Sequence, residues 1–167
     1  MFVPFNEIPD DSKLWIYISN RILTTLEKET LLGKVEPFLE RWRSEGTAFK
    51  SSYQFLEDQI LIVTGYGDDF SLSGCAMDAL MKTVTKWGES LGVDFTTIPK
   101  FCYRHQDLII AGSRKDFKAA VEAGEINDET IVLDNTLLTL GEFKTNFEKK
   151  VLDCWHNKVY QKALSKV

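Results

Sequence analysis

The chain has 167 residues, the size of a single domain, and can bury a sizeable core without a disulfide or metal staple. A hydrophobic fraction of 44% and a charged fraction of 27% predict a folded protein and exclude a disordered one. The net charge of −5, with Lys and Arg interleaved among Asp and Glu, argues against nucleic-acid binding, which needs a basic surface.

The first elements predicted along the chain are a strand and a helix. Leu14–Ile18 is aromatic and β-branched, which predicts a strand buried on both faces. Thr24 and Glu27 have capping-box spacing at the start of a helical pattern. Pro37 lies inside that pattern, so we expect a kink there or a second helix that begins at it.

A hairpin and a second helix follow. Residues 49–55 and 60–64 predict two strands joined by a short turn. A glycine-containing polar loop, 65–73, then leads into an amphipathic helix that runs to residue 91. Gly92 is placed to end this helix.

The last third of the chain predicts another hairpin over 101–111, a helix over 115–123 and a strand at Thr130–Leu133. Thr139 and Glu142 form a further capping box, which predicts a long C-terminal helix. The apolar residues that would line one side of this helix are Phe143, Phe147, Val151 and Trp155.

The order strand, helix, strand, strand, helix, strand is typical of a ferredoxin-like split βαβ core. In this arrangement the helices pack on one face of a mainly antiparallel sheet. The remaining hairpin, helix, strand and helix would extend the core. The sequence therefore predicts one α+β domain over residues 1–167.

Several common chemistries leave no motif in this sequence. There is no P-loop, no complete dinucleotide-binding GxGxxG, and no HExxH, GxSxG or EF-hand pattern. The three cysteines show no CxxC spacing and there are only two histidines, so we expect neither a metal site nor a cofactor. With no signal peptide and no apolar run long enough to span a membrane, we expect a cytoplasmic protein with free thiols.

The segment from Ser73 to Asp78 is the first candidate site. It passes from a glycine-containing loop into a helix, whose first amides lack partners and carry partial positive charge. An anionic ligand group could bind there, and a thiol at Cys75 would become more nucleophilic. The alternative is structural: Ser73 caps the helix, Gly74 forms a turn and Cys75 fills space.

Other candidate residues lie in the second half of the chain. His105 and Arg104 lie next to a predicted turn, where the histidine could be a general base or an ordinary exposed residue. His156 follows Trp155 and could take part in a site or form a hydrogen bond in a structural role. Asn135, just after a predicted strand, could bind a ligand or form an Asx-turn.

Five groups of residues occur in an order that is specific as a set: Phe5–Ser12 with Trp15–Tyr17, Ser73–Cys75 with Asp78, Thr130–Val132 with Asn135, Gly141 with Glu142, and Cys154–Asn157. In these residues the chain resembles a family of bacterial proteins of about this length, found in Bacteroidetes. Its members are often labelled ABC-transporter ATPase, although this chain lacks the P-loop that such an activity needs.

The resemblance implies a shared fold and no particular activity. It also implies a shared site at Ser73, Cys75, Asp78, Asn135, Glu142, Trp155 and His156. Where the family has a serine before the tryptophan, this chain has Cys154, which departs from the pattern.

Two functions are compatible with these features. The first is a non-catalytic domain that binds a small or anionic ligand, or acts as an adaptor, with its site at Gly65–Asp78. The second is a cysteine-dependent enzyme with Cys75 as nucleophile, His105 or His156 as base, and helix amides that stabilise an oxyanion. The partner would be a small molecule or a protein, and the partly amphipathic stretch 151–167 would form either a homodimer contact or a solvated helix.

Overall fold

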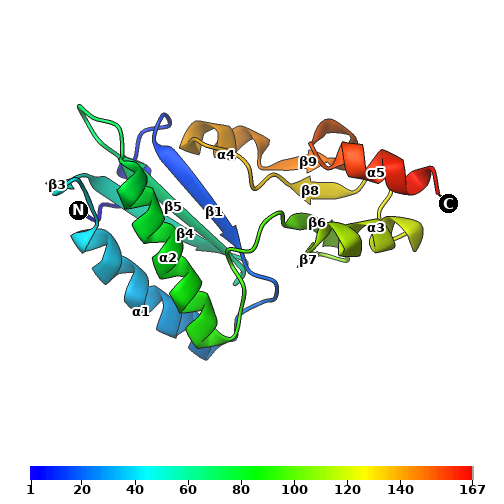
Figure 1. Ribbon diagram of the computed structural model, residues 1–167, viewed down its shortest axis with the longest axis horizontal. Helices are drawn as coiled ribbons and strands as arrows, with labels where there is room; N and C mark the ends of the chain where they lie inside the picture. Colours follow the sequence, from blue (N-terminus) through cyan, green and yellow to red (C-terminus); the bar gives the residue numbers. More distant parts are fainter. Residues whose placement is uncertain (167) are drawn as a thin grey trace.

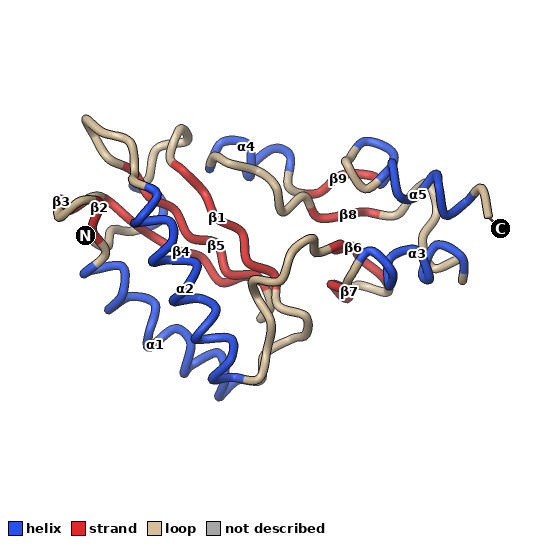
Figure 2. The backbone as a smooth tube through the Cα atoms, viewed as in Figure 1, coloured by secondary structure: helices blue, strands red, loops and turns tan. Residues whose placement is uncertain are grey.

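A computed structural model describes residues 1–166 of the chain. It is an α+β fold, as the sequence predicts, and its sheets are antiparallel. Figures 1 and 2 show two groups of strands, each with its own helices. The elements are η1 (Phe5–Glu7), β1 (Lys13–Ile18), α1 (Thr25–Arg41), β2 (Arg43–Ser44), β3 (Thr47–Ala48), β4 (Lys50–Leu56), β5 (Ile60–Tyr66), α2 (Gly74–Leu91), β6 (Phe101–His105), β7 (Leu108–Gly112), α3 (Arg114–Glu122), β8 (Ile131–Leu133), α4 (Leu140–Asn146), β9 (Glu148–Lys150), η2 (Val151–Asp153) and α5 (Asn157–Leu164).

The N-terminal sheet has three strands in the order β1-β5-β4, and α1 and α2 cover one of its faces (Figure 1). Glu57 and Asp58 both have positive φ, which gives the tight turn that sets the β4–β5 register. The capping box of Thr24 with Glu27 begins α1, as expected, and Gly92 ends α2 in the left-handed conformation. Leucine, valine and tryptophan side chains from both helices pack against this face.

Helix α1 continues past Pro37 to Arg41, so the expected second helix does not begin there. A proline removes one hydrogen bond to the carbonyl four residues earlier, which here belongs to Gly33. Both Pro37 and Gly33 lie on the exposed side of the helix, where water can satisfy that carbonyl. The buried side, with Leu31, Val35 and Leu39, therefore stays intact.

The strand expected to complete the ferredoxin-like core leaves the N-terminal sheet. After α2 the chain forms β6, which pairs with β7 and β8 in a separate C-terminal sheet of order β7-β6-β8-β9. Helices α3 and α5 pack on one face of this second sheet around Phe117, Val121 and Tyr160. The N-terminal sheet therefore holds three of the four strands of the expected arrangement, and β1 is an edge strand.

The two sheets share a third hydrophobic cluster. It combines residues of β1 and β5, among them Leu14 and Ile62, with Cys102 of β6 and Leu133 of β8. The side chain of Gln59 also bridges the sheets, because its Nε2 donates to the backbone oxygens of Ser19 and Ile109. The two halves of the chain are thus packed directly against each other.

The long C-terminal helix predicted from the capping box at Thr139 does not form. Helix α4 ends at Asn146, β9 then pairs with β8, and a separate helix α5 follows. The four apolar residues expected on one helix side serve different packing regions. Phe143 and Phe147 pack against the cluster between the sheets, whereas Val151 and Trp155 pack with α3 and α5.

Candidate functional site

The start of α2 is capped within the protein. The Ser73 Oγ accepts a hydrogen bond from the Ala76 amide at 3.2 Å, and the Ser73 amide donates to Ser44 Oγ at 2.9 Å. Gly74, Cys75 and Asp78 are exposed on the helix surface. The hydrogen bonds of Ser73 are therefore explained by its structural role as the cap of α2.

Two further candidates have clear structural partners. The Arg104 guanidinium bonds both carboxylate oxygens of Glu57, at 2.8 and 2.7 Å, and also Glu148, so it joins the two sheets. Glu142 accepts hydrogen bonds from the Leu138 and Thr139 amides and so caps α4. His105 lies half-buried at the end of β6, beside the turn to β7.

His156 is fully buried in the C-terminal half. Its ring stacks on Trp155 with centroids 3.8 Å apart, and its Nδ1 lies 3.2 Å from the Cys154 sulfur. Its Nε2 has no partner among the described residues, and burial lowers the pKa of His156 to about 4. Figure 1 places α5 at the opposite end of the molecule from the start of α2, so neither His156 nor its surroundings reach Cys75.

A cavity of about 660 Å³ lies along the outer edge of β1. It brings together two residues that the sequence singled out, Asn135 and Trp155, from segments distant in the chain. One wall comes from α2 and the loop that follows it, and the other from the loop before α4. The lining residues are Leu14, Trp15, Ile16, Tyr17, Ile18, Met81, Phe95, Thr96, Thr97, Ile98, Pro99, Lys100, Asn135, Thr136, Leu137, Leu138 and Trp155.

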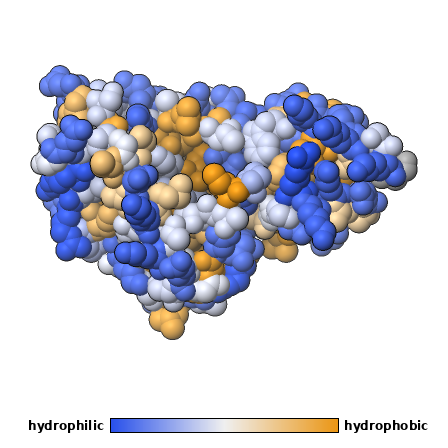
Figure 3. All heavy atoms as spheres, in the orientation of Figure 1, coloured by the Kyte–Doolittle hydropathy of each residue, from blue (hydrophilic) through white to orange (hydrophobic). Residues whose placement is uncertain are grey.

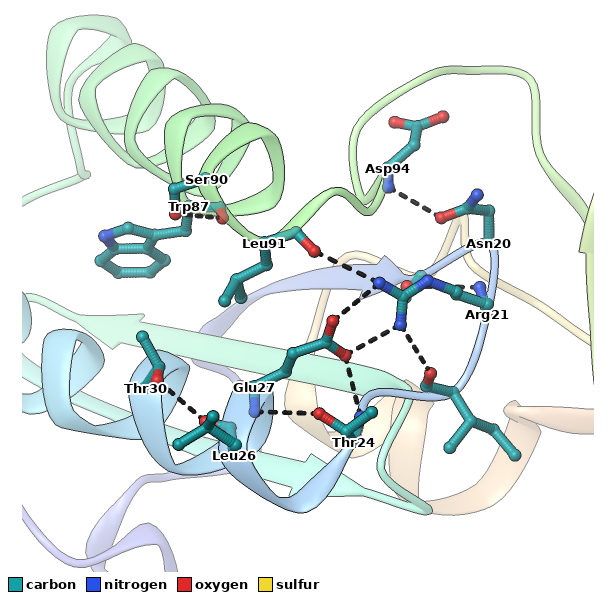
Figure 4. A network of polar contacts seen from close by, with 12 residues as sticks. Asn20, Arg21, Thr24, Leu26, Glu27, Thr30, Trp87, Ser90, Leu91 and Asp94 are labelled. Atoms are coloured by element: carbon teal, nitrogen blue, oxygen red, sulfur yellow. Dashed lines mark hydrogen bonds and ion pairs between the residues drawn. The ribbon is translucent and has the colours of Figure 1, made fainter.

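The loop wall is fixed to the end of β1 by a polar network, shown in Figure 4. The Asn20 side chain accepts from the Asp94 amide at 2.8 Å, and the Asn20 amide donates to the Asp94 carbonyl at 3.1 Å. Arg21 binds both carboxylate oxygens of Glu27 and the Leu91 carbonyl. Its hydrogen bonds lower the pKa of Glu27 to about 2, so this anchor stays charged at neutral pH.

Lys100 places a buried cation at one end of the cavity. Its side chain is 7% exposed, and its Nζ donates to the backbone oxygens of Ile18 and Asp94, both at 2.7 Å. The nearest carboxylate oxygen, Asp94 Oδ2, lies 3.9 Å away, beyond hydrogen-bond distance. Burial lowers the pKa of Lys100, because desolvation disfavours the charged form.

Two neutral polar groups complete the lining. The Tyr17 hydroxyl is buried without a partner among the described residues, and this burial raises the pKa of Tyr17. A buried hydroxyl without a hydrogen bond costs free energy, and because this oxygen has almost no accessible surface it is not open to a ligand in the cavity. The Asn135 side chain donates to the Lys100 carbonyl at 3.0 Å and so ties the two walls together.

The indole of Trp155 is held in place from behind. Its Nε1 donates to Asp134 Oδ1 at 3.1 Å, and the other Asp134 oxygen binds the Lys149 ammonium at 2.8 Å. Burial raises the pKa of Asp134, but hydrogen bonds from Lys149 and Thr136 outweigh it, and the net pKa is lowered. Asp134 is therefore a carboxylate at neutral pH and fixes the aromatic wall.

The rim of the cavity is apolar and exposed. Ile98 and Leu138 are 76% and 72% exposed, and Met81 is 41% exposed. Figure 3 shows apolar atoms gathered near the middle of one face, between α2 and the C-terminal half. A contiguous apolar surface around a hollow is characteristic of a binding site.

Sequence reasoning missed most of this cavity. The signal that could have found it is Lys100, a lysine within the apolar stretch Ile98–Phe101. The strand Leu14–Ile18 was expected to be buried on both faces, and that is correct for most of its side chains. A pattern of side-chain burial does not reveal whether the backbone edge of a strand is paired, so the edge position of β1 stayed hidden.

Within residues 1–166 there is no group of three or more His, Cys, Asp or Glu side chains placed to hold a metal ion. In the same range no helix has the length and apolar character needed to cross a bilayer. Comparison with protein-family models, curated proteins and solved structures finds no match to this chain. The resemblance to the Bacteroidetes family therefore stays a prediction.

Proposed function

We propose that this protein is a non-catalytic binding domain whose ligand lies in the cavity along β1. The observation that carries the proposal is the combination, in one cavity of about 660 Å³, of mainly apolar walls with the buried ammonium of Lys100. Binding sites for small ligands typically have this volume and a few fixed polar groups. The ligand would be largely apolar and carry a polar or anionic group.

This proposal keeps the binding role expected from the sequence but moves its site. At the start of α2, Ser73 and Ser44 already occupy part of the hydrogen-bonding capacity on which an anion site would depend. The cavity instead offers one unused donor on Lys100, since an ammonium has three and two are bonded. The cysteine-dependent enzyme gains no support, because His156 contacts Cys154 in the C-terminal half and β6, which ends at His105, lies away from the start of α2 (Figure 1).

The test uses the fluorescent probe 1-anilinonaphthalene-8-sulfonate, which is apolar with one anionic group. We expect saturable binding to the native protein, and at least tenfold weaker binding to Thr97→Trp, which places an indole on the cavity wall. Thr97 is exposed, so the change should leave the fold intact. The matched control is Thr47→Trp, at another exposed threonine, which lies in β3.

Lys100→Met should weaken the same probe by removing the cation. Probe binding that is absent in the native protein, or that Thr97→Trp and Thr47→Trp affect equally, would place the ligand elsewhere and contradict the proposal. Circular dichroism of each variant establishes that a loss of binding is not a loss of folding.

A further inference from the structure

Within residues 1–166 no further strand of the N-terminal sheet lies beside β1. The order of this sheet is β1-β5-β4, and the chain that leaves α2 crosses the end of β1 and enters the C-terminal sheet instead (Figure 2). The cavity occupies the vacant position, because its lining includes five consecutive residues of β1, Leu14–Ile18. The space therefore follows the direction of a strand.

The backbone of β1 has unpaired groups that point into this position. In an antiparallel pair, alternate residues direct both their N–H and C=O groups to the same side. The Leu14 amide donates outward to Leu138 O at 2.9 Å, and Ile18 O accepts from Lys100, so the even-numbered residues face outward. Ile16 lies between them, and its N–H and C=O have no protein partner within residues 1–166.

The open stretch is bounded at both ends by the chain itself. At the Leu14 end, Lys13 forms a bridge with Thr139 and the edge is closed. At the other end, the Asn20 amide pairs with the Asp94 carbonyl. The cavity is also walled on each side, by the loop 95–100 and by residues 135–138, so a single extended segment would fit it better than the edge of another folded sheet.

The same sheet already binds an extended segment at its opposite edge. Residues 1–3 lie parallel to β4, where the Val3 amide donates to Ser51 O and the Ser51 amide donates to Met1 O, both at 2.9 Å. Two such bonds hold a short stretch of chain without a hairpin. The β1 edge offers the equivalent pair of groups on one residue, Ile16.

The position of the Lys100 charge indicates which way an extended segment in the cavity would run. Lys100 lies at the Ile18 end of the open stretch with two of its three N–H groups bonded and the third unused. A carboxylate there would complete its hydrogen bonds and compensate its buried charge. A peptide chain carries such a group at its C-terminus, next to the N–H and C=O groups that a strand edge pairs with.

We propose that the cavity binds the C-terminal residues of an extended, mainly apolar peptide, which adds to β1 as a fourth strand with its terminal carboxylate at Lys100. The peptide runs parallel to β1 and exchanges backbone hydrogen bonds with Ile16. This inference rests on the proposed function, because it names the ligand of the same cavity. Its alternate side chains would lie against Met81 on one side and Leu137 on the other.

The experiment measures fluorescence polarisation of a hexapeptide pool with fluorescein at the N-terminus, a free C-terminal carboxylate, and Val, Ile, Phe or Thr at the last four positions. We expect saturable binding and at least tenfold weaker binding of the same pool with an amidated C-terminus. Ile16→Pro removes the outward N–H and should bind at least tenfold more weakly than Ile16→Ala, which removes a similar part of the side chain. In Lys100→Met the difference between acid and amide should disappear.

Amide exchange of the unaltered protein, followed by NMR, does not depend on whether the proline variant folds. The Ile16 amide should exchange at least tenfold more slowly when the peptide pool is present. An unchanged exchange rate, equal binding by Ile16→Pro and Ile16→Ala, or equal binding of acid and amide would overturn strand addition. If the anilinonaphthalene probe still binds in that case, the proposed function stands and only the peptide assignment fails.

Discussion

The two outer edges of the N-terminal sheet differ in what lies beside them. The β4 edge pairs at Ser51 with the N-terminal segment, and its remaining outward residues, Tyr53 and Phe55, do not line the cavity that lies beside β1. The β1 edge is closed at both ends by the loops that flank it, and its open middle at Ile16 lies in a cavity.

This comparison shows that an unpaired strand edge is not by itself a binding site. Unpaired backbone groups alone can bond to water, and edge strands with such groups are common. At β1 the walls and the cation add selectivity, because they limit the occupant to one extended chain of particular charge. The following predictions test whether the two sides of β1, and the two edges of the sheet, differ in this way.

The largest difference should separate neighbouring residues of β1. Trp15 faces β5 across the pair Trp15↔Val63, and its backbone N–H belongs to that ladder, whereas the Ile16 N–H points outward. Trp15→Pro should therefore cost more than about 3 kcal/mol relative to Trp15→Ala and prevent folding. Ile16→Pro should stay within about 1 kcal/mol of Ile16→Ala in the same urea denaturation experiment. Similar losses for the two proline variants would show that Ile16 is paired.

Acid should destabilise the protein through His156, which lies in the C-terminal half next to the cavity residue Trp155. His156 stacks behind the cavity residue Trp155, and burial lowers its pKa from 6.5 to about 4. Between these pH values the unfolded chain binds a proton that the folded protein does not. The free energy of unfolding should thus rise by about 3 kcal/mol from pH 4 to pH 6.5 and then level off.

The control for this pH dependence is His156→Leu, which has a similar volume and no titrating group. Urea denaturation across the same pH range should show that most of the rise is gone. A rise of equal size in the variant would mean that other groups cause it.

Removal of residues 1–3 tests the paired edge of β4. It eliminates the two backbone bonds to Ser51, the bond from the Met1 amino group to Phe49 O, and the burial of Val3. The stabilisation that these contacts provide is partly offset by the entropy cost of ordering three residues. We therefore expect the deletion to lower the free energy of unfolding by about 2 kcal/mol. Thermal or urea unfolding measures the loss, and the anilinonaphthalene probe should still bind, because the cavity lies at the other edge.

The smallest effect is expected at Cys75. Cys75→Ser should change stability by less than about 0.5 kcal/mol, because the thiol is exposed and has no hydrogen-bond partner within residues 1–166. In the native protein Cys75 should react first with a thiol reagent. Cys102 should react only on unfolding, because burial raises its pKa to about 12. If Cys75→Ser lost ligand binding, the result would contradict the cavity and support a site at the start of α2.

The local elements of this fold were within reach of the sequence. Capping boxes at Thr24 and Thr139, the serine caps at Ser73 and Ser113 and the glycine at Gly92 all occur where their spacing indicates. Each depends on residues only a few positions apart, and so does the side-chain periodicity that defines the helices and the hairpin turns. The α+β class follows from these elements.

The pairing of strands that are distant in the sequence could not be predicted from such local patterns. Nothing near Phe101 specifies that β6 pairs with β7 and β8 instead of β1, because strand partners are chosen by the packing of whole surfaces. The prediction of one long C-terminal helix was wrong for the same reason, because residues 148–150 form β9, which is stabilised by pairing with the distant strand β8.

The sequence by itself therefore determined where the chain turns, which residues cap its helices and which side chains are apolar enough to be buried. Only the tertiary structure decided that β1 is an edge and that Lys100, Asn135 and Trp155 meet beside it. The physical reason is that a cavity is the space that packing leaves unfilled. Its position depends on contacts between segments more than a hundred residues apart, such as Leu14 and Leu138, and no local pattern encodes them.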